Sequence, residues 1–198
     1  MKVLSALCVS ILGAGLLAEA APALKGDGTG NLVANGSFED GPAVPAEGYK
    51  PLDKGATDLK GWVVTRGQID AVRETGGLWK AADGKRCLDL HGSPGLGGVK
   101  QTVATRAGRK YRVTFQMSGN PGGGHTKVSL TVRAAGADKE FAIDMAGRTL
   151  DDLKWEKKTW EFTAAGAATE LEIHTAMPPT SNPFAGPLLD DVRVMAID

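Results

Sequence analysis

Few residues in this chain have the spacing that catalysis requires. The histidines are His91, His125 and His174. No two of them form the His-x-x-x-His pair of a zinc hydrolase. Asp151–Asp152 and Asp190–Asp191 are adjacent pairs of acids, and neighbours on a strand point to opposite faces, so neither pair is arranged as the acid and base of a glycosidase. The sequence therefore predicts a protein that is not an enzyme.

Charge and cysteine content narrow the class of protein further. The 198 residues carry 23 Lys and Arg against 23 Asp and Glu. This neutrality argues against nucleic acid or an acidic membrane as partner, because both require a basic surface. Cys8 lies in the apolar N-terminal segment, and its removal would leave Cys87 alone, with no intrachain disulfide. We expect Cys87 to be structural, and a bound metal to be a candidate for fixing the loops.

The first twenty residues have the pattern of a secretory signal peptide. Lys2 precedes an almost entirely apolar run over 3–17, and Ala18-Glu19-Ala20 places small residues where signal peptidase reads them. The run is too short and too weakly flanked to predict a transmembrane anchor. We expect 1–20 to be a signal peptide, with cleavage within 21–23 and an N-terminal anchor helix as alternatives. The protein is then secreted, to the extracellular space or the cell envelope.

The remainder of the chain has the period of β-strands. Apolar and polar residues alternate in short segments that glycine-rich turns separate. Strands are expected at 61–65, 68–72, 87–91, 99–103, 111–117, 128–133, 141–145, 160–163, 171–174 and 192–194. Strands that are apolar on one face close into a two-sheet sandwich. We therefore predict an all-β fold, with a flexible leader over 21–30 and one jelly-roll β-sandwich over 31–198.

A series of motifs resembles galactose-binding-like jelly rolls. Asn31–Glu39 is similar to the segment that opens many of them, including xylan- and glucan-binding modules, and Leu188–Val194 is similar to the segment that closes them. Between these come, in order, Gly61-Trp62, Gln68–Asp70, Ala82–Lys85, Leu88–Leu90, Val99–Thr102 and Gly108–Tyr111. The ordered set resembles the bacterial choice-of-anchor C family and is similar to the plant cell-wall family called domain of unknown function 642. The resemblance implies a secreted jelly roll linked to extracellular polysaccharide.

The resemblance also implies a structural calcium site. In such jelly rolls the first and last strands are neighbours, so Glu39 and Asp190 can meet, and in related carbohydrate-binding modules the matching acids hold calcium, which prefers oxygen ligands. By strand phase Asp190 points inward with Val192 and Val194, and a buried carboxylate requires a partner. Asp191 is the second choice as ligand. The alternative is that Glu39 and Asp190 only cap turns through backbone N–H groups.

A glycan site would combine flat aromatic faces with polar side chains. Trp62 and Trp160 are in phase with strands, which places them in the core. Trp79 lies in a glycine-rich loop, either as a lid over the sandwich or as an exposed platform, and Trp155 precedes a strand. The polar candidates are Asp89, His91, Asn120 and His125. Their alternatives are a solvated sheet face for Asp89 and His91 and a plain turn for the other two.

Three functions remain open on these observations. The favoured hypothesis is a secreted, non-catalytic carbohydrate-binding module for an extracellular or cell-wall polysaccharide. The alternative is a structural or adhesive protein of the cell envelope that binds another protein, and the third is a glycan-active enzyme without a recognisable motif. No residue pattern distinguishes xylan, pectin, galactan or glucan as the ligand.

Overall fold

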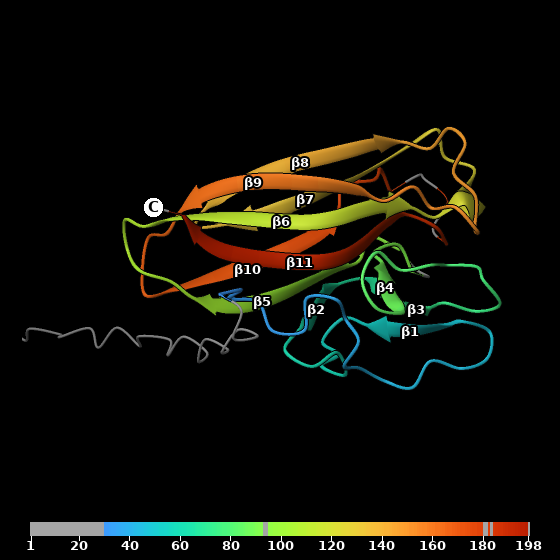
Figure 1. Ribbon diagram of the computed structural model, residues 1–198, viewed down its shortest axis with the longest axis horizontal. Coiled ribbons are helices and arrows are strands. Elements are labelled where there is room, and N and C mark those ends of the chain that lie inside the picture. The colour runs from blue at the N-terminus through green and yellow to red at the C-terminus, as the bar shows by residue number, and fades with distance from the viewer. Residues whose placement is uncertain (1–29, 93–94, 180–181, 183, 198) are drawn as a thin grey trace, which may run out of the picture.

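The structure is a computed structural model that describes residues 30–92, 95–179, 182 and 184–197. The predicted signal peptide and nearly all of the leader lie outside these residues. The described chain forms two antiparallel sheets packed face to face (Figure 1). The six-stranded sheet has the order β1 (Tyr49–Asp53), β3 (Gln68–Arg73), β4 (Arg86–Asp89), β11 (Pro187–Ile197), β6 (Lys110–Gly119), β9 (Glu156–Thr163). The five-stranded sheet has the order β2 (Val63–Arg66), β5 (Gly98–Ala104), β10 (Ala168–Thr175), β7 (Lys127–Ala134), β8 (Ala137–Asp144). The predicted all-β sandwich is confirmed.

The core lies between the two sheets and follows from the alternation in the strands. In β6 the side chains of Tyr111, Val113, Phe115 and Met117 are buried, while the residues between them face outward. Phe115 meets Phe141 of the opposite sheet edge-to-face, with ring centroids 5.2 Å apart. This alternation gives the six-stranded sheet an inner face in the core and an outer face that carries polar side chains.

Trp62 belongs to the core, as predicted. It is 1% exposed, packs on Phe38 with ring centroids 5.4 Å apart, and donates its indole N–H to the Asn35 carbonyl oxygen. Trp160 is half-buried, packs against the core and has its ring centroid 6.1 Å from that of Phe162. Neither tryptophan is free to act as a binding platform.

The opening motif lies along the last strand without forming a strand itself. The Leu32 N–H donates to the Val194 carbonyl oxygen at 2.8 Å, and the Val192 N–H donates to the Gly36 carbonyl oxygen at 2.9 Å. The Asn31 carboxamide oxygen accepts from the Val194 N–H at 2.9 Å. The two terminal motifs are therefore neighbours in space, as the resemblance implied.

A β-bulge changes which face of the sheet Asp190 occupies. Asp190 lies opposite Gln116 and Arg193 lies opposite Thr114, so β11 has one residue more than β6 in this interval, and Asp191 has a φ of 46°. Gln116 points outward, and directly opposite residues share a face. The prediction that Asp190 points inward with Val192 is therefore wrong about the face. The carboxylate is buried, but on the outer face of the six-stranded sheet.

The sequence pattern did not indicate strand β1. Pro51 interrupts it, and proline is tolerated only where a strand has a free edge. β1 is the edge strand of the six-stranded sheet, paired with β3 through Tyr49–Val72 and Pro51–Asp70. This edge strand becomes important because it forms one wall of a pocket.

Gly36 is required by the close approach of the opening motif to β11. A Cβ atom built on Gly36 would lie 2.0 Å from the Val192 carbonyl oxygen, which is backbone and cannot move away easily. We predict that Gly36→Ala lowers the free energy of unfolding by about 2–4 kcal/mol, as steric conflicts in packed sites do. Gly166→Ala is the matched control, since a Cβ there would meet only the Ala168 carbonyl oxygen at 3.9 Å. Denaturant unfolding measures both; equal midpoints for the two variants would contradict the prediction.

Candidate functional site

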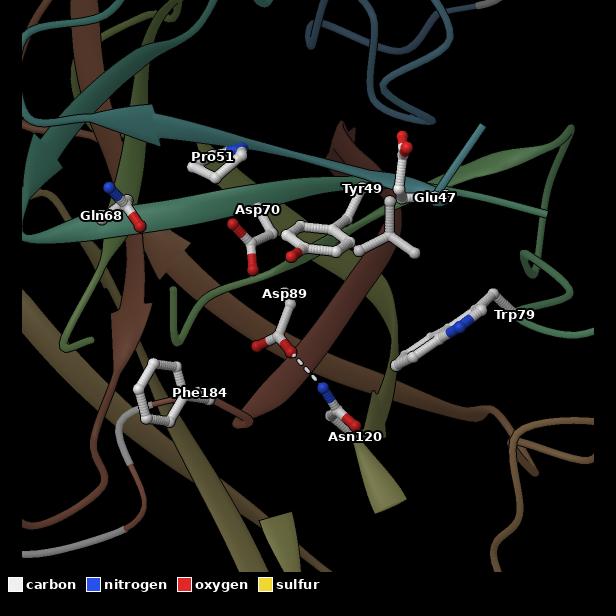
Figure 2. A pocket seen from close by; sticks show the side chains of 11 residues that line it. Glu47, Tyr49, Pro51, Gln68, Asp70, Trp79, Asp89, Asn120 and Phe184 are labelled. Carbon is white, nitrogen blue, oxygen red and sulfur yellow. Dashed lines mark hydrogen bonds between the residues drawn. The ribbon is translucent and has the colours of Figure 1, made fainter. Parts of the chain in front are cut away.

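A pocket of ≈ 470 Å³ opens on the outer face of the six-stranded sheet, at the end where β1, β3 and β4 meet (Figure 2). Its floor carries polar side chains and its rim carries aromatic ones. The polar residues are Glu47, Gln68, Asp70, Asp89 and Asn120. The aromatic residues are Tyr49, Trp79 and Phe184. The volume is within the range of pockets that bind small molecules or short oligomers.

Strand register brings two carboxylates together on the floor of this pocket. Pro51 lies opposite Asp70 in the β1–β3 pair, and Asp70 lies opposite Asp89 in the β3–β4 pair. Directly opposite residues share a face, so all three side chains line one row across the sheet. Figure 2 shows both carboxylates pointing into the middle of the pocket.

Asp89 is almost completely buried and fully hydrogen-bonded. Its Oδ1 accepts from the backbone N–H groups of His91 at 2.9 Å and Gly186 at 3.1 Å, and its Oδ2 accepts from the Asn120 side-chain amide at 2.8 Å. The pKa of Asp89 is raised to about 7: burial is the main cause, these hydrogen bonds oppose the rise, and the neighbouring charge of Asp70 adds to it. Asp89 therefore holds the β4 end, the Asn120 turn and the Phe184 loop together.

Asp70 has fewer partners than its neighbour. Its Oδ1 is shielded from solvent and has no hydrogen-bond partner within the described structure. Burial raises the pKa of Asp70 to about 6. A carboxylate in this state has lost hydration without full compensation, and a ligand that brings a donor or a positive charge would restore it.

The aromatic rim comes from three separate parts of the chain. Tyr49 is on the edge strand β1, Trp79 is in the β3–β4 loop, and Phe184 is in the loop before β11. Tyr49 is 51% exposed and Phe184 is 64% exposed, although both side chains are large and apolar. In Figure 2, Tyr49 and Trp79 stand on one side of the carboxylates and Phe184 stands on the other. A ligand in the pocket would therefore have ring faces on both sides.

Trp79 is held in place by the loop that precedes β9. Its backbone N–H donates to the Leu150 carbonyl oxygen at 2.8 Å, and the next residue, Lys80, accepts the indole N–H of Trp155 at 2.8 Å. Trp79 itself has a φ of 62°, a left-handed conformation that is uncommon for a bulky residue. Trp155 thus supports the Trp79 loop from outside the pocket.

His91 and His125 position the loop that carries Phe184. The Nδ1 atom of His91 and the Nε2 atom of His125 each lie 3.0 Å from the Ala185 carbonyl oxygen. A carbonyl oxygen only accepts, so each of these nitrogens carries the proton it donates. Burial lowers the pKa of His91, which keeps the ring neutral. Neither histidine lines the pocket.

Asp190 clamps the start of the segment that leads into β4. Its Oδ2 accepts from the backbone N–H groups of Ala82 at 2.7 Å and Asp83 at 2.9 Å, and its Oδ1 accepts from the N–H of Asp191 at 2.7 Å. The side chain is completely buried, and burial raises its pKa to about 7 against the opposing effect of these three hydrogen bonds. This is the turn-capping alternative that the sequence left open.

Glu39 clamps the other end of the same segment. Its Oε1 accepts from the backbone N–H groups of Lys85 and Arg86, both at 2.7 Å. A Cβ atom on Gly84 would lie 2.4 Å from this oxygen, and Gly84 has a φ of 70°, so only glycine suits the position. The acids of the opening and closing motifs thus meet at 82–86, which we call the clamped segment.

The predicted metal ligands therefore serve as hydrogen-bond acceptors. Within the described residues, no three or more His, Cys, Asp or Glu side chains are grouped as a metal site would need. Glu39 and Asp191 line one shallow surface pocket, but Asp190 does not, and Arg193 from the same pocket forms an ion pair with Asp191 at 2.6 Å. Calcium binding by these acids stays a prediction.

The six predicted ligand-binding residues divide into two groups. Trp79, Asp89 and Asn120 line the pocket, whereas His91, His125 and Trp155 lie behind it and hold its loops. Their contact with a ligand stays a prediction. Sequence reasoning missed the pocket residues Tyr49, Asp70 and Phe184. For Asp70 the alternation of apolar and polar residues over 68–72 was a usable signal, because it places this side chain on the outer face of the strand, away from the core.

Two packed antiparallel sheets with a pocket on an outer face define a jelly-roll β-sandwich. The chain belongs to the family described as "Protein of unknown function (DUF642)", whose family model matches residues 31–195. The predicted similarity to that family is confirmed. Membership of the choice-of-anchor C family stays a prediction.

One relative in sequence and two similar solved structures illustrate what this chain resembles. Halomucin from Haloquadratum walsbyi is 29% identical over 174 residues, which are 83% of this chain and 2% of halomucin, so the chain spans a very small part of that relative. The structure of TmCBM61 in complex with β-1,4-galactotriose is 17% identical, with a TM-score of 0.50, and the match covers 84% of this chain and 99% of that one. The arabinose-bound α-L-arabinofuranosidase MgGH51 is 13% identical, with a TM-score of 0.55, over 86% of this chain and 27% of that one. None of the helical structure in the described part of our chain is long and apolar enough to cross a membrane.

The raised pKa of Asp70 predicts how pH affects stability. Between about pH 4 and 6 the folded state holds this proton while the unfolded state has lost it, so Asp70 makes the fold less stable as pH rises. Asp70→Asn removes this loss, and it should raise stability at about pH 8 by about 1–2 kcal/mol, a value reduced for partial exposure, or about 2–8 °C in Tm. The gain should vanish below about pH 4. Thermal melts across pH measure it, with the exposed Asp58→Asn as control; a variant no more stable than the wild type at the higher pH would refute the burial argument.

Calcium is tested by a thermal melt in excess calcium against one in chelator. If calcium binds the folded state, Tm should rise by about 5–10 °C at a hundredfold excess over the dissociation constant, from roughly 2.7 kcal/mol of added stability. Glu39→Gln keeps an acceptor oxygen for Lys85 and Arg86 but loses the charge, so it should abolish only the calcium-dependent part. Asp190→Ala should destabilise in both conditions, because three backbone N–H groups lose their acceptor. Identical wild-type melts would leave both acids as acceptors alone.

Proposed function

We propose that this protein is a secreted, non-catalytic carbohydrate-binding module that holds a polysaccharide segment in the pocket on its six-stranded sheet. The observation that carries the proposal is the rim of Tyr49, Trp79 and Phe184 around a polar floor. Sugar rings present apolar faces that stack on aromatic rings and hydroxyl groups that pair with carboxylates and amides. The pocket offers both kinds of contact in one place.

The exposure of the rim supports binding over a structural role. Tyr49 and Phe184 are each more than half exposed, so these rings gain little from burial in the free protein. Large apolar side chains that gather on a surface around a pocket are typical of interaction sites. The residues next to two of the rings are hydrogen-bonded to other parts of the chain: the Lys80 carbonyl, after Trp79, accepts from Trp155, and the Ala185 carbonyl, after Phe184, accepts from His91. Such contacts support the positions of these rings, and a site arranged in advance loses less entropy on binding.

The geometry of the floor favours binding over hydrolysis. Paired acids with raised pKa values are the residues a glycosidase would use, and Asp70 and Asp89 are such a pair. However, both oxygens of Asp89 are engaged by hydrogen bonds and its side chain is 1% exposed, so it cannot approach an anomeric carbon. The two acids also stand side by side on one sheet, whereas hydrolysis requires them to flank the bond. Release of reducing sugar on incubation with polysaccharides would favour the enzyme instead.

A β-1,4-linked galactose oligomer is the first ligand to test, because a similar structure contains one. TmCBM61 was solved with β-1,4-galactotriose, and its fold covers most of this chain. The N-terminal pattern over 1–20 supports export to the place where such polymers occur. A structural or adhesive protein that binds another protein through the same aromatic rim is the competing function, and a glycan array distinguishes the two.

We predict that removing a rim ring weakens glycan binding without unfolding the domain. Phe184→Ala and Tyr49→Ala should each reduce the affinity for any polysaccharide that the wild type binds by about 10-fold or more. An aromatic contact contributes about 1 kcal/mol or more in addition to the free energy of burying its apolar area. Met195→Ala is the matched control, because Met195 is also large, apolar and 45% exposed but lines none of the pockets described. The measurement is affinity electrophoresis or a pull-down on xylan, pectin, galactan and glucan, with calcium and with chelator. Equal retention of all three variants would place binding elsewhere.

A further inference from the structure

The charges that line the pocket have one sign only. Glu47, Asp70 and Asp89 contribute three carboxyl groups. Among the residues that the structure describes, no Lys, Arg or His lines this pocket. The surface salt bridges of the described chain lie elsewhere, for example Arg112–Glu161 and Arg133–Asp138 on other strands. The positive charge that would balance the floor is therefore missing from the pocket itself.

The two floor carboxylates make this imbalance costly. Asp70 and Asp89 are cross-strand neighbours, and like charges directly opposite each other are unfavourable. Asp70 has one oxygen that is buried without a partner, and Asp89 obtains its hydrogen bonds only from neutral groups. A positive charge between the rims would relieve both the repulsion and the lost hydration.

The surrounding rings suit a particular kind of cation. Tyr49, Trp79 and Phe184 carry aromatic rings that stand around the two carboxylates (Figure 2). Aromatic faces attract organic ammonium groups through their negative π-surfaces, and they offer no oxygen ligands to a metal ion. The described residues also hold no cluster of three or more metal-ligating side chains.

We propose that the pocket selects a glycan unit that carries a protonated amine, an amino sugar, with the ammonium placed over Asp70 and Asp89 and the sugar ring against Tyr49, Trp79 or Phe184. This inference rests on the proposed carbohydrate-binding function and adds the chemical class of the ligand. It also predicts that the pocket rejects uronic acids, because a ligand carboxylate would face those of Asp70 and Asp89.

The test compares four β-linked or pectic oligosaccharides of equal length by isothermal titration calorimetry. They are a glucosamine oligomer, its N-acetylated form, a cello-oligosaccharide and a galacturonate oligomer. The glucosamine oligomer should bind at least about 10-fold more tightly than the neutral cello-oligosaccharide, and the galacturonate oligomer should not bind. N-acetylation removes the charge and should remove the preference.

Variants connect the preference to the floor of the pocket. Asp70→Asn should bring the affinity ratio between the glucosamine and cello-oligosaccharides close to one, because it removes the charge while the side chain keeps its shape. Asp58→Asn is the matched control, because it removes one acid from an exposed loop outside the pocket and should leave the ratio unchanged. Thermal melts confirm that both variants fold.

Each result decides between the two proposals. Equal wild-type affinity for the amine and neutral oligomers, with loss of both in Phe184→Ala, would overturn the amino-sugar inference and keep the carbohydrate-binding function. A preference that survives Asp70→Asn would also overturn the inference, because the charge would then act elsewhere. Binding that occurs only with calcium would assign recognition to a metal ion instead. Absence of binding by all four would overturn the amino-sugar inference, and absence of retention on xylan, pectin, galactan and glucan as well would count against the carbohydrate-binding function.

Discussion

The pocket depends on two carboxylates, from opposite ends of the sequence, that hold one short segment. Glu39 of the opening motif and Asp190 of the closing motif together accept four backbone N–H groups of the clamped segment. That segment leads from the Trp79 loop into β4, which carries Asp89. Without these acceptors, four N–H groups would be left without partners at the point where the pocket is built. These hydrogen bonds to Glu39 and Asp190 connect distant parts of the chain, as disulfides do in many small secreted domains.

The pocket itself contains groups that make the fold less stable. Asp89 is buried, Asp70 lies half-buried beside it, and both have raised pKa values, while Trp79 has a left-handed backbone conformation. Such features are found where binding requires them, and the rest of the sandwich compensates. Here the compensation comes from the apolar layer between the sheets, where residues such as Phe115, Leu130 and Ile173 are almost completely buried. The destabilising groups thus lie on the outer face, and the stabilising contacts lie in the packed interior.

The sequence predicted those features that leave a regular alternation of apolar and polar residues, and it missed those that interrupt it. The alternation in 111–117 and in the other central strands predicted the sandwich correctly, because burial on one face leaves a period of two. The edge strand β1 escaped prediction because Pro51 breaks the pattern, and Asp190 was assigned to the wrong face because the bulge at Asp191 inserts a residue. His91 and His125 were recognised as special, but their partner is a backbone carbonyl of a loop, which no spacing reveals. Phe184 carries no sequence signal, since its exposure follows from the path of that loop.

The pairing of the opening motif with β11 has a consequence for how the domain can be mounted. Leu32 hydrogen-bonds to Val194, so the chain enters and leaves the sandwich at neighbouring points. These points are at the end of β11 where Ile197 pairs with Lys110, whereas Asn120, at the opposite end of β6, lines the pocket (Figure 1). Any polypeptide attached before or after the domain would therefore emerge from the side away from the aromatic rim. A domain with this arrangement can be inserted into a longer chain while its pocket faces away from the points of attachment.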